Sequence, residues 1–175
     1  QSESTEPDIW ENLITGAYGY YNQELSNHQI YGNLYNWYTV GDDRGVCPEN
    51  WHVPTDEEFI SLEIFLGMTE TEAYFTDFRG TNEGSMLAGN ADLWDDGELK
   101  NNNDFGTNGF NVLPAGHRYA NPGSYNLMGS YAYFWSSTEL SSSNAWSRLL
   151  GYDNSEVYRG INNKHYGFSI RCLMD

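Results

Sequence analysis

The residue types that catalysis uses most often are present in this chain, but their spacing does not assemble a reactive site. The four histidines are scattered, at His28, His52, His117 and His165. Paired carboxylates occur at Asp42–Asp43 and Asp95–Asp96, but the side chains of adjacent residues would point apart on a strand. The chain has no Gly-x-Ser-x-Gly elbow, no Gly-Lys phosphate loop and no His-Glu-x-x-His motif. The sequence therefore predicts that this protein is not an enzyme.

A cluster of oxygen-bearing side chains in the middle of the chain is a candidate cation site. It consists of Asn90, Asp92, Asp95, Asp96, Glu98 and Asp104. Calcium prefers six to eight such oxygen ligands. The spacing departs from the EF-hand pattern, because Trp94 takes a ligand position and Gly97 is out of place. Bound calcium and a plain polar loop both stay open, and the sequence predicts no other cofactor.

Aromatic side chains are the third resource for binding, at 16% of the residues. Tyr131, Tyr133 and Trp135 recur at period two and would share one face of a strand, as would Trp146 and Arg148 on the next. Such rings beside polar groups can stack on and bond a sugar or a peptide. The alternative is that they form the core. The candidate contact residues are Trp94, Asn108, Arg118, Tyr133 and Trp146.

Two cysteines bear on where the protein works. Cys47 lies just before the best-specified helix, and Cys172 ends the last apparent strand. In that strand Cys172 shares an apolar face with Phe168 and Ile170, so it should point inward. We predict a Cys47–Cys172 disulfide, with two separate buried thiols as the alternative. A disulfide implies an extracytoplasmic location, at a cell surface or in a periplasm.

Composition excludes several classes of partner. Lys and Arg number 8 against 25 Asp and Glu, for a formal net charge of −17. Nucleic acid and anionic membrane surfaces would repel such a chain. No apolar run reaches the ~20 residues of a membrane span. The expected partner is therefore a glycan or a surface protein, reached without membrane insertion.

The elements that must position these groups begin with a helix inside the stretch 45–67. Thr55 and Glu58 form a capping box, and Gly67 can end the helix. Its apolar positions, Phe59, Leu62, Phe65 and Leu66, predict one buried face. A second capping box at Thr69 and Glu72 predicts a helix that runs to about Phe78 and closes at Gly80.

The rest of the chain divides into polar loops and short strands. Residues 1–8 are expected to be a disordered leader and residues 9–175 a single domain. Lipid anchoring of the protein before trimming stays open. Strands are expected at 9–13 and within 30–40, the latter running into a short helical turn, and a long packed or functional loop over 81–109. Late antiparallel strands are expected at Gly109–Leu113, Tyr131–Ser136, Ala145–Leu150, Glu156–Arg159 and Gly167–Leu173. Helices early and strands late predict an α+β fold.

Several segments together resemble a known bacterial family, the Fibrobacter succinogenes major paralogous domain. They are YGNLYNWYTV, GVCPENWHVPTDEEF, TNGFNVLPAGHR, YFWSSTE, AWSRLL and GFSIRCLMD, and they span about Tyr31 to Asp175. The resemblance implies a C-type lectin-like fold, with two short helices early and twisted antiparallel strands late. It also implies that the N- and C-terminal parts meet. VPTDEEF is similar to a segment of formylglycine-generating enzymes, which share that fold.

The resemblance does not bring an activity with it, because one fold hosts many functions. Neither cysteine occupies the position of the reactive pair in formylglycine-generating enzymes. The tripeptide Glu-Pro-Asn and the strand motif Trp-Asn-Asp of calcium-dependent lectins are both missing. We therefore expect a non-catalytic recognition module on a bacterial surface that binds a glycan or a protein. The alternatives are an enzyme of the formylglycine-generating type and a ligand-free structural or adhesin-tip domain.

Overall fold

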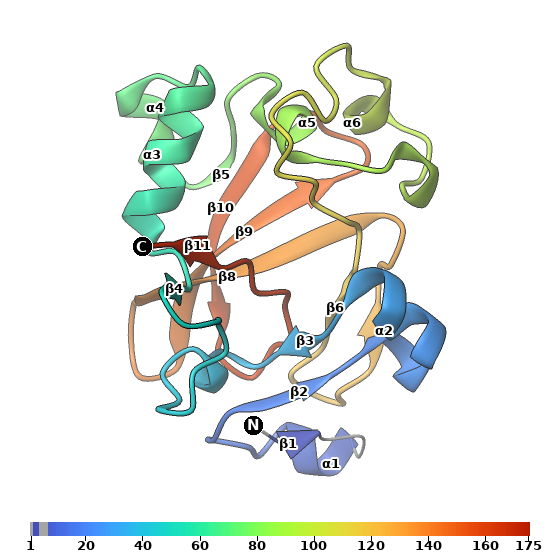
Figure 1. Cartoon of the computed structure of the whole chain (residues 1–175), viewed down its shortest axis with the longest axis vertical. Coiled ribbons are helices and arrows are strands. Elements are labelled where there is room, and N and C mark those ends of the chain that lie inside the picture. Colours follow the sequence, from blue (N-terminus) through green and yellow to red (C-terminus); the bar gives the residue numbers. More distant parts are fainter. Residues whose placement is uncertain (1, 4–6) are drawn as a thin grey trace.

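The computed structural model describes residues 2–3 and 7–175 and shows a mixed α/β fold around one antiparallel sheet (Figure 1). The sheet has the strand order β5-β10-β9-β8. Its strands are β5 (Asp77–Arg79), β8 (Tyr131–Glu139), β9 (Asn144–Gly151) and β10 (Val157–Asn163). All three pairings are antiparallel, with a register shift between Trp135 and Glu139 of β8. The three long strands, β8, β9 and β10, confirm three of the five predicted late strands.

Three small sheets and a set of short helices surround this sheet. The sheets are formed by β1 (Ser2–Glu3), β2 (Ala17–Gly19) and β3 (Leu34–Tyr35), by β4 (Trp51–His52) with β11 (Leu173–Met174), and by β6 (His117–Arg118) with β7 (Tyr125–Asn126). The helices are α1 (Pro7–Trp10), α2 (Leu25–Tyr31), α3 (Asp56–Leu66), α4 (Glu70–Ala73), α5 (Glu83–Leu87) and α6 (Glu98–Asn101). Short 3₁₀ turns occupy Tyr21–Gln23, Trp37–Thr39 and Ala91–Leu93. None of the described helices is long and apolar enough to cross a bilayer.

The central sheet buries both of its faces. On one face Phe134 and Val157 join the core cluster that contains Phe59 of α3 and Leu87 of α5. On the other face Trp135 packs against Phe168, in the segment that leads to the C-terminus. Period-two alternation along the strands separates the two sets of residues, as a pleated sheet requires. The prediction that Tyr131, Tyr133 and Trp135 share one face is confirmed by the contacts among Tyr131, Tyr133, Trp135 and Phe168.

Helix α3 begins and ends where the sequence predicts. The Glu58 N–H donates to Thr55 Oγ1 at 3.2 Å, and the Thr55 N–H donates to the Glu58 carboxylate at 2.8 Å, which completes the capping box. Phe59 is buried, and Leu62 and Leu66 pack against the same core. The prediction that Phe65 belongs to the buried face is wrong, because 86% of this residue is exposed. The helix buries Ile60 and Glu63 instead, so its buried side is turned away from Phe65.

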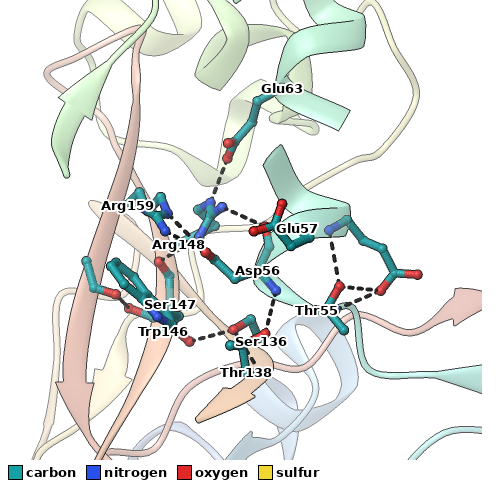
Figure 2. Close-up of polar contacts among 12 residues, drawn as sticks. Thr55, Asp56, Glu57, Glu63, Ser136, Thr138, Trp146, Ser147, Arg148 and Arg159 are labelled. Carbon is teal, nitrogen blue, oxygen red and sulfur yellow. Dashed lines mark hydrogen bonds and ion pairs between the residues drawn. The ribbon is translucent and has the colours of Figure 1, made fainter. Parts of the chain in front are cut away.

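A buried network of charges attaches α3 to the sheet. Arg148 and Arg159 lie directly opposite each other on β9 and β10, where two like charges would normally repel. The Asp56 carboxylate accepts from both, at 2.6 Å each. Glu63 accepts from Arg148 Nε at 2.6 Å and pairs with Arg79 of β5. Figure 2 shows Asp56 and Glu63 extending from the helix to Arg148, so one helix supplies the counter-charges of the strands.

Burial and pairing act in opposite directions on these groups. Burial by itself would raise the pKa of the Asp56 carboxyl, but the hydrogen bonds and charges of Arg159 and Arg148 outweigh it and hold that pKa below its ordinary value. Burial lowers the pKa of Arg79 to about 10. Both groups therefore stay charged at neutral pH, and each depends on its partners.

The predicted disulfide is confirmed. Cys47 and Cys172 are bridged, with 5.8 Å between their Cα atoms and a sequence separation of 125. Beside the bridge, β11 pairs with β4, and the Asp175 N–H donates to Asn50 O at 3.1 Å. In Figure 1 the C-terminus accordingly lies next to the start of α3. The N- and C-terminal parts of the chain do meet.

Three predicted elements differ from the structure, each for its own physical reason. The second capped helix stops at Ala73 instead of about Phe78, since Asp77–Arg79 pair with β10 as β5 and Asp77 takes a φ of 69°. The strand expected at 9–13 is replaced by α1, which begins at Pro7, a residue well suited to the first helical turn. The strand expected at 109–113 is reduced to one bridge between Ala88 and Val112, beside Asn111 at a φ of 56°.

The other predictions for irregular segments hold in part. Leu34–Tyr35 is a strand followed by a 3₁₀ turn, as expected within 30–40. The long 81–109 segment is internally packed, since Leu87, Trp94 and Leu99 are core residues. The final strand is interrupted: only isolated bridges involve 167–169, and β11 is two residues long. Of the expected leader, Ser2–Glu3 pair with Ala17–Tyr18, and residues 1 and 4–6 lie outside the described residues.

Removing the disulfide should destabilise the fold strongly. A bridge across a loop of this length restricts the unfolded chain by about 5 kcal/mol in the chain-entropy model. The double variant Cys47→Ser/Cys172→Ser should therefore lose about that much free energy of unfolding, as measured by guanidinium denaturation. Reduced wild-type protein should match the variant. A variant as stable as the oxidised protein would show that the bridge contributes nothing.

Breaking the charge network should be almost as costly. Arg148→Met would leave Asp56 and Glu63 buried without a shared partner, which costs about 3–5 kcal/mol in comparable buried pairs. The matched control is Arg44→Met, which removes an exposed arginine paired with Asp42 and should change little. Urea denaturation of both variants measures the difference. Equal losses in the two variants would contradict an anchoring role for the network.

Candidate functional site

An aromatic cavity of about 190 Å³ lies on the face of the central sheet opposite α3. Its lining comes from five parts of the chain: β6 with the residue after it, the residue after β7, strand β8, strand β10, and the segment before the C-terminus. The lining residues are His117, Tyr119, Leu127, Tyr133, Asn162, Tyr166 and Phe168. None of them carries a charge at neutral pH, because the one histidine is held neutral, as described below.

A tight backbone crossing places His117 in the wall of this cavity. Gly116 takes a φ of 66°, and a Cβ atom there would collide with the backbone of Asn126 and Met128. The Gly116 N–H donates to Tyr131 O at 2.8 Å, and His117 is then opposite Asn126 in the β6–β7 hairpin. Glycine is needed here because only it combines this φ with such close approach. The hairpin thereby lies against the start of β8.

His117 is a buried polar group without a hydrogen bond. It is 4% exposed, and neither ring nitrogen has a hydrogen-bond partner among the described residues. Its ring instead meets Tyr119 and Tyr133 edge to face, with centroids 4.6 and 4.8 Å away. Burial lowers the pKa of His117 to about 4. The imidazole is therefore neutral at physiological pH, with one donor and one acceptor nitrogen.

The aromatic rings of the cavity support one another. Tyr133 stacks on Phe168 with centroids 4.8 Å apart and an interplanar angle of 24°. Tyr166 contacts both Phe168 and Tyr119, at 5.6 and 5.8 Å. Burial raises the pKa of Tyr133 to about 12, so its hydroxyl keeps its proton. The cavity is thus a preformed, neutral, aromatic site.

Polar groups around the cavity are left available for a ligand. The hydroxyl groups of Tyr119, Tyr133 and Tyr166 make no hydrogen bond within the part of the chain that the structure describes. The side-chain amide of Asn162 donates from Nδ2 to Ser147 Oγ at 2.8 Å, and this bond does not use the side-chain oxygen Oδ1. Tyr119 is 37% exposed and forms part of the rim. A ligand that enters can therefore meet both ring faces and hydrogen-bonding groups.

Of the five predicted contact residues, the structure places only Tyr133 in this cavity. Trp94 is 3% exposed and donates from Nε1 to Gly89 O at 3.1 Å, so it belongs to the core. Arg118 is fully buried, with its guanidinium over the rings of Trp10 and Tyr125 at 4.1 and 5.1 Å. Neither side chain offers surface to a ligand, and we do not carry them further.

The other two predicted contacts lie elsewhere and are not brought together with Tyr133. Asn108 is exposed, and its Oδ1 accepts from the Phe110 N–H at 2.9 Å, which is a turn interaction. Trp146 is half-buried on the opposite face of the sheet, where Arg159 lies 3.8 Å from its ring centroid (Figure 2). Trp146 therefore packs against the charge network that attaches α3.

The acidic cluster of the 81–109 segment is dispersed. Asp95 accepts from Ser130 Oγ at 2.5 Å, Glu98 accepts from Ser155 Oγ at 2.9 Å, and Asp104 bonds the Asn82 amide. Across residues 2–3 and 7–175 no three acidic, His or Cys side chains come close enough together to hold a metal ion. We carry no calcium site forward.

Several cavity residues were missed because their partners are remote in sequence. His117 with Tyr119 and Tyr166 with Phe168 each follow the period-two pattern that would have marked them as facing one side of an extended segment. A larger, open hollow of about 300 Å³ lies beside the disulfide, near Cys47 and His52. We prefer the aromatic cavity, because both His52 nitrogens are already bonded, to Glu58 and Asp175.

Fold and cavity define a disulfide-bonded domain of mixed α/β structure with a small, neutral aromatic site. Comparison with protein-family models identifies the family. The model of the Fibrobacter succinogenes major domain matches residues 2–174, so the chain belongs to that family. No curated protein and no solved structure matches the chain.

The burial of His117 should make folding stability depend on pH. The unfolded chain protonates this histidine near pH 6.5, whereas the folded chain does so only near pH 4. Between these values the unfolded state binds more protons, so the free energy of unfolding falls as the pH is lowered, by about 3 kcal/mol in all. Urea denaturation between pH 7 and pH 4 measures this loss, and His117→Phe should remove it.

The matched control is His28→Phe, which should keep the pH dependence of the wild type. Some slope should also persist in His117→Phe, because burial lowers the pKa of His165 as well. If His117→Phe and wild type lost stability in parallel from pH 6.5 to 4, His117 would not be held neutral in the fold.

Proposed function

We propose that this chain is a non-catalytic, extracytoplasmic recognition module of a bacterial cell surface, which holds part of a glycan or of a surface protein in the aromatic cavity. The observation that carries the proposal is a neutral cavity whose tyrosine hydroxyls and Asn162 carbonyl lack partners within the described chain. Buried or half-buried polar groups left in this state are ordinarily satisfied by water or by a ligand.

Two further observations support the non-catalytic and extracytoplasmic parts of the proposal. Both cysteines are joined in the Cys47–Cys172 bridge, so neither is available as the thiol that a formylglycine-generating reaction would need. A structural disulfide persists in oxidising compartments. The formal charge of −17 disfavours nucleic acid as the partner.

We also propose that the fold is C-type lectin-like. Support comes from the early helices α3 and α4, the later antiparallel strands β8 to β10, and the closure of the chain ends by a disulfide and the β4–β11 pair. The calcium-dependent mode of sugar binding is not part of the proposal, because the acidic side chains of the 81–109 segment are dispersed among separate partners.

Glycan arrays and arrays of bacterial surface proteins test the function. Leu127→Trp adds bulk to an exposed leucine that lines the cavity, and Leu140→Trp makes the same change at an exposed leucine outside it. We expect binding by the wild type and by Leu140→Trp, and a loss of at least tenfold in Leu127→Trp. Circular dichroism checks that both variants fold.

Two results would overturn the proposal in different ways. Binding to no glycan and no surface protein would leave a ligand-free structural domain as the better account. Binding that Leu127→Trp does not weaken would place the binding site elsewhere on the molecule.

A further inference from the structure

The size of the aromatic cavity limits what can enter it. Pockets that enclose drug-sized ligands measure roughly 300–1,000 Å³, whereas this cavity measures about 190 Å³. It accommodates one ring rather than an oligosaccharide chain or a folded peptide. A longer ligand would have to enter with a single terminal or protruding unit, past Tyr119 at the rim.

The lining selects against charged ligands. The rings that pack against His117 are those of Tyr119, Tyr133, Tyr166 and Phe168, and none of these side chains is ionised near neutral pH. No lining residue could form an ion pair with a carboxylate or a phosphate. An anion that entered would lose its water without a charged partner, which is costly in a buried site.

The distribution of polar groups indicates a ligand that carries hydroxyls around an apolar ring. Tyr133 comes from β8, Asn162 from β10 and Tyr166 from the C-terminal segment, so the three hydrogen-bonding groups come from three separate segments of the chain. Tyrosine hydroxyls can both donate and accept, and the Asn162 carbonyl can accept. Between them the faces of the aromatic rings offer apolar surface. A sugar ring has C–H groups for such faces and hydroxyls at its edge.

We propose that the cavity binds one uncharged pyranose ring, whose hydroxyls bond to Tyr133, Tyr166 and Asn162 without a divalent cation. This inference rests on the proposed recognition function and names the chemical class that the site selects. The ring fills the space beside the neutral His117 and stacks on the aromatic wall. The anionic sugars, such as uronic acids, are excluded by the absence of charge in the lining.

A quaternary ammonium group is the main competing ligand, because aromatic cages bind such cations. It would use the ring faces of this cavity and would be attracted by the acidic protein. It would, however, leave the hydroxyls of Tyr133 and Tyr166 and the Asn162 carbonyl without partners, since it has no hydrogen-bonding groups. The polar lining therefore favours the sugar, and the cation becomes an outcome of the test.

The experiment is an NMR titration of the full chain with single-ring probes. The probes are the methyl pyranosides of glucose, galactose, mannose and N-acetylglucosamine, with methyl glucuronide and choline as charged comparisons. One ring is a small ligand, so a dissociation constant on the order of 1 mM is expected for the best neutral pyranoside. Adding EDTA should not change it, and methyl glucuronide should bind at least tenfold more weakly.

The variants test the assigned contacts. Tyr133→Phe/Tyr166→Phe removes two hydroxyls and keeps both rings, so it should bind the pyranoside at least tenfold more weakly. The matched control is Tyr74→Phe, which removes a hydroxyl bonded to Glu57 on the α3 side of the molecule and should bind like the wild type.

Each contrary result has a separate meaning. Tighter binding of choline than of every pyranoside, loss of binding in EDTA, or unchanged binding by the double variant would each overturn the sugar assignment. If arrays show glycan binding that Leu127→Trp abolishes but no single ring binds at tens of millimolar, the recognition function stands and the single-ring inference is wrong. A negative result on every array would instead overturn the proposed function itself.

Discussion

The structure depends on a small group of charges buried between α3 and the central sheet. Arg148 and Arg159 face each other across β9 and β10, and their repulsion is removed by Asp56, which bonds both. Glu63, further along the same helix, pairs with Arg148 and Arg79. Taking charges out of water costs several kcal/mol per ion unless each is closely paired, so this arrangement tolerates little displacement. The network thereby attaches α3 to the three strands β5, β9 and β10.

The two faces of the sheet consequently have different roles. The face toward α3 is occupied by the charge network and by the apolar core around Phe59 and Val157, and the Arg159 guanidinium lies over the ring of Trp146. The opposite face is covered by aromatic rings, some packed edge to face and some stacked, which leave a space that no side chain fills. Its polar edges belong to residues from four separate segments. The cavity is neutral at physiological pH, because burial keeps His117 unprotonated, and this suits the binding role that we propose.

The disulfide joins the two ends of this architecture. It ties the residues before α3 to the segment after Phe168, and Tyr166 and Phe168, just before that segment, line the aromatic cavity. The C-terminal segment therefore contacts both regions. It bridges to β3, β6 and β8 beside the cavity, and it pairs with β4 just before α3. Membership of the Fibrobacter succinogenes major domain family describes this whole unit, since the match runs over residues 2–174.

Much of the fold was predictable from local sequence, and much of the site was not. The limits of α3 follow from Thr55, Glu58 and Gly67, because capping is an interaction between residues three or four apart. The long late strands follow from period-two alternation, and the disulfide from two cysteines in well-specified elements. Local pattern failed where distant partners decide the outcome: Asp77–Arg79 became a strand because β10 pairs with it, and Phe65 is exposed because Glu63 is drawn to Arg148. The aromatic cavity is the clearest case. Tyr133 could be singled out from its strand, but His117, Asn162 and Tyr166 meet it only after four segments pack together, and no spacing along the chain records that meeting.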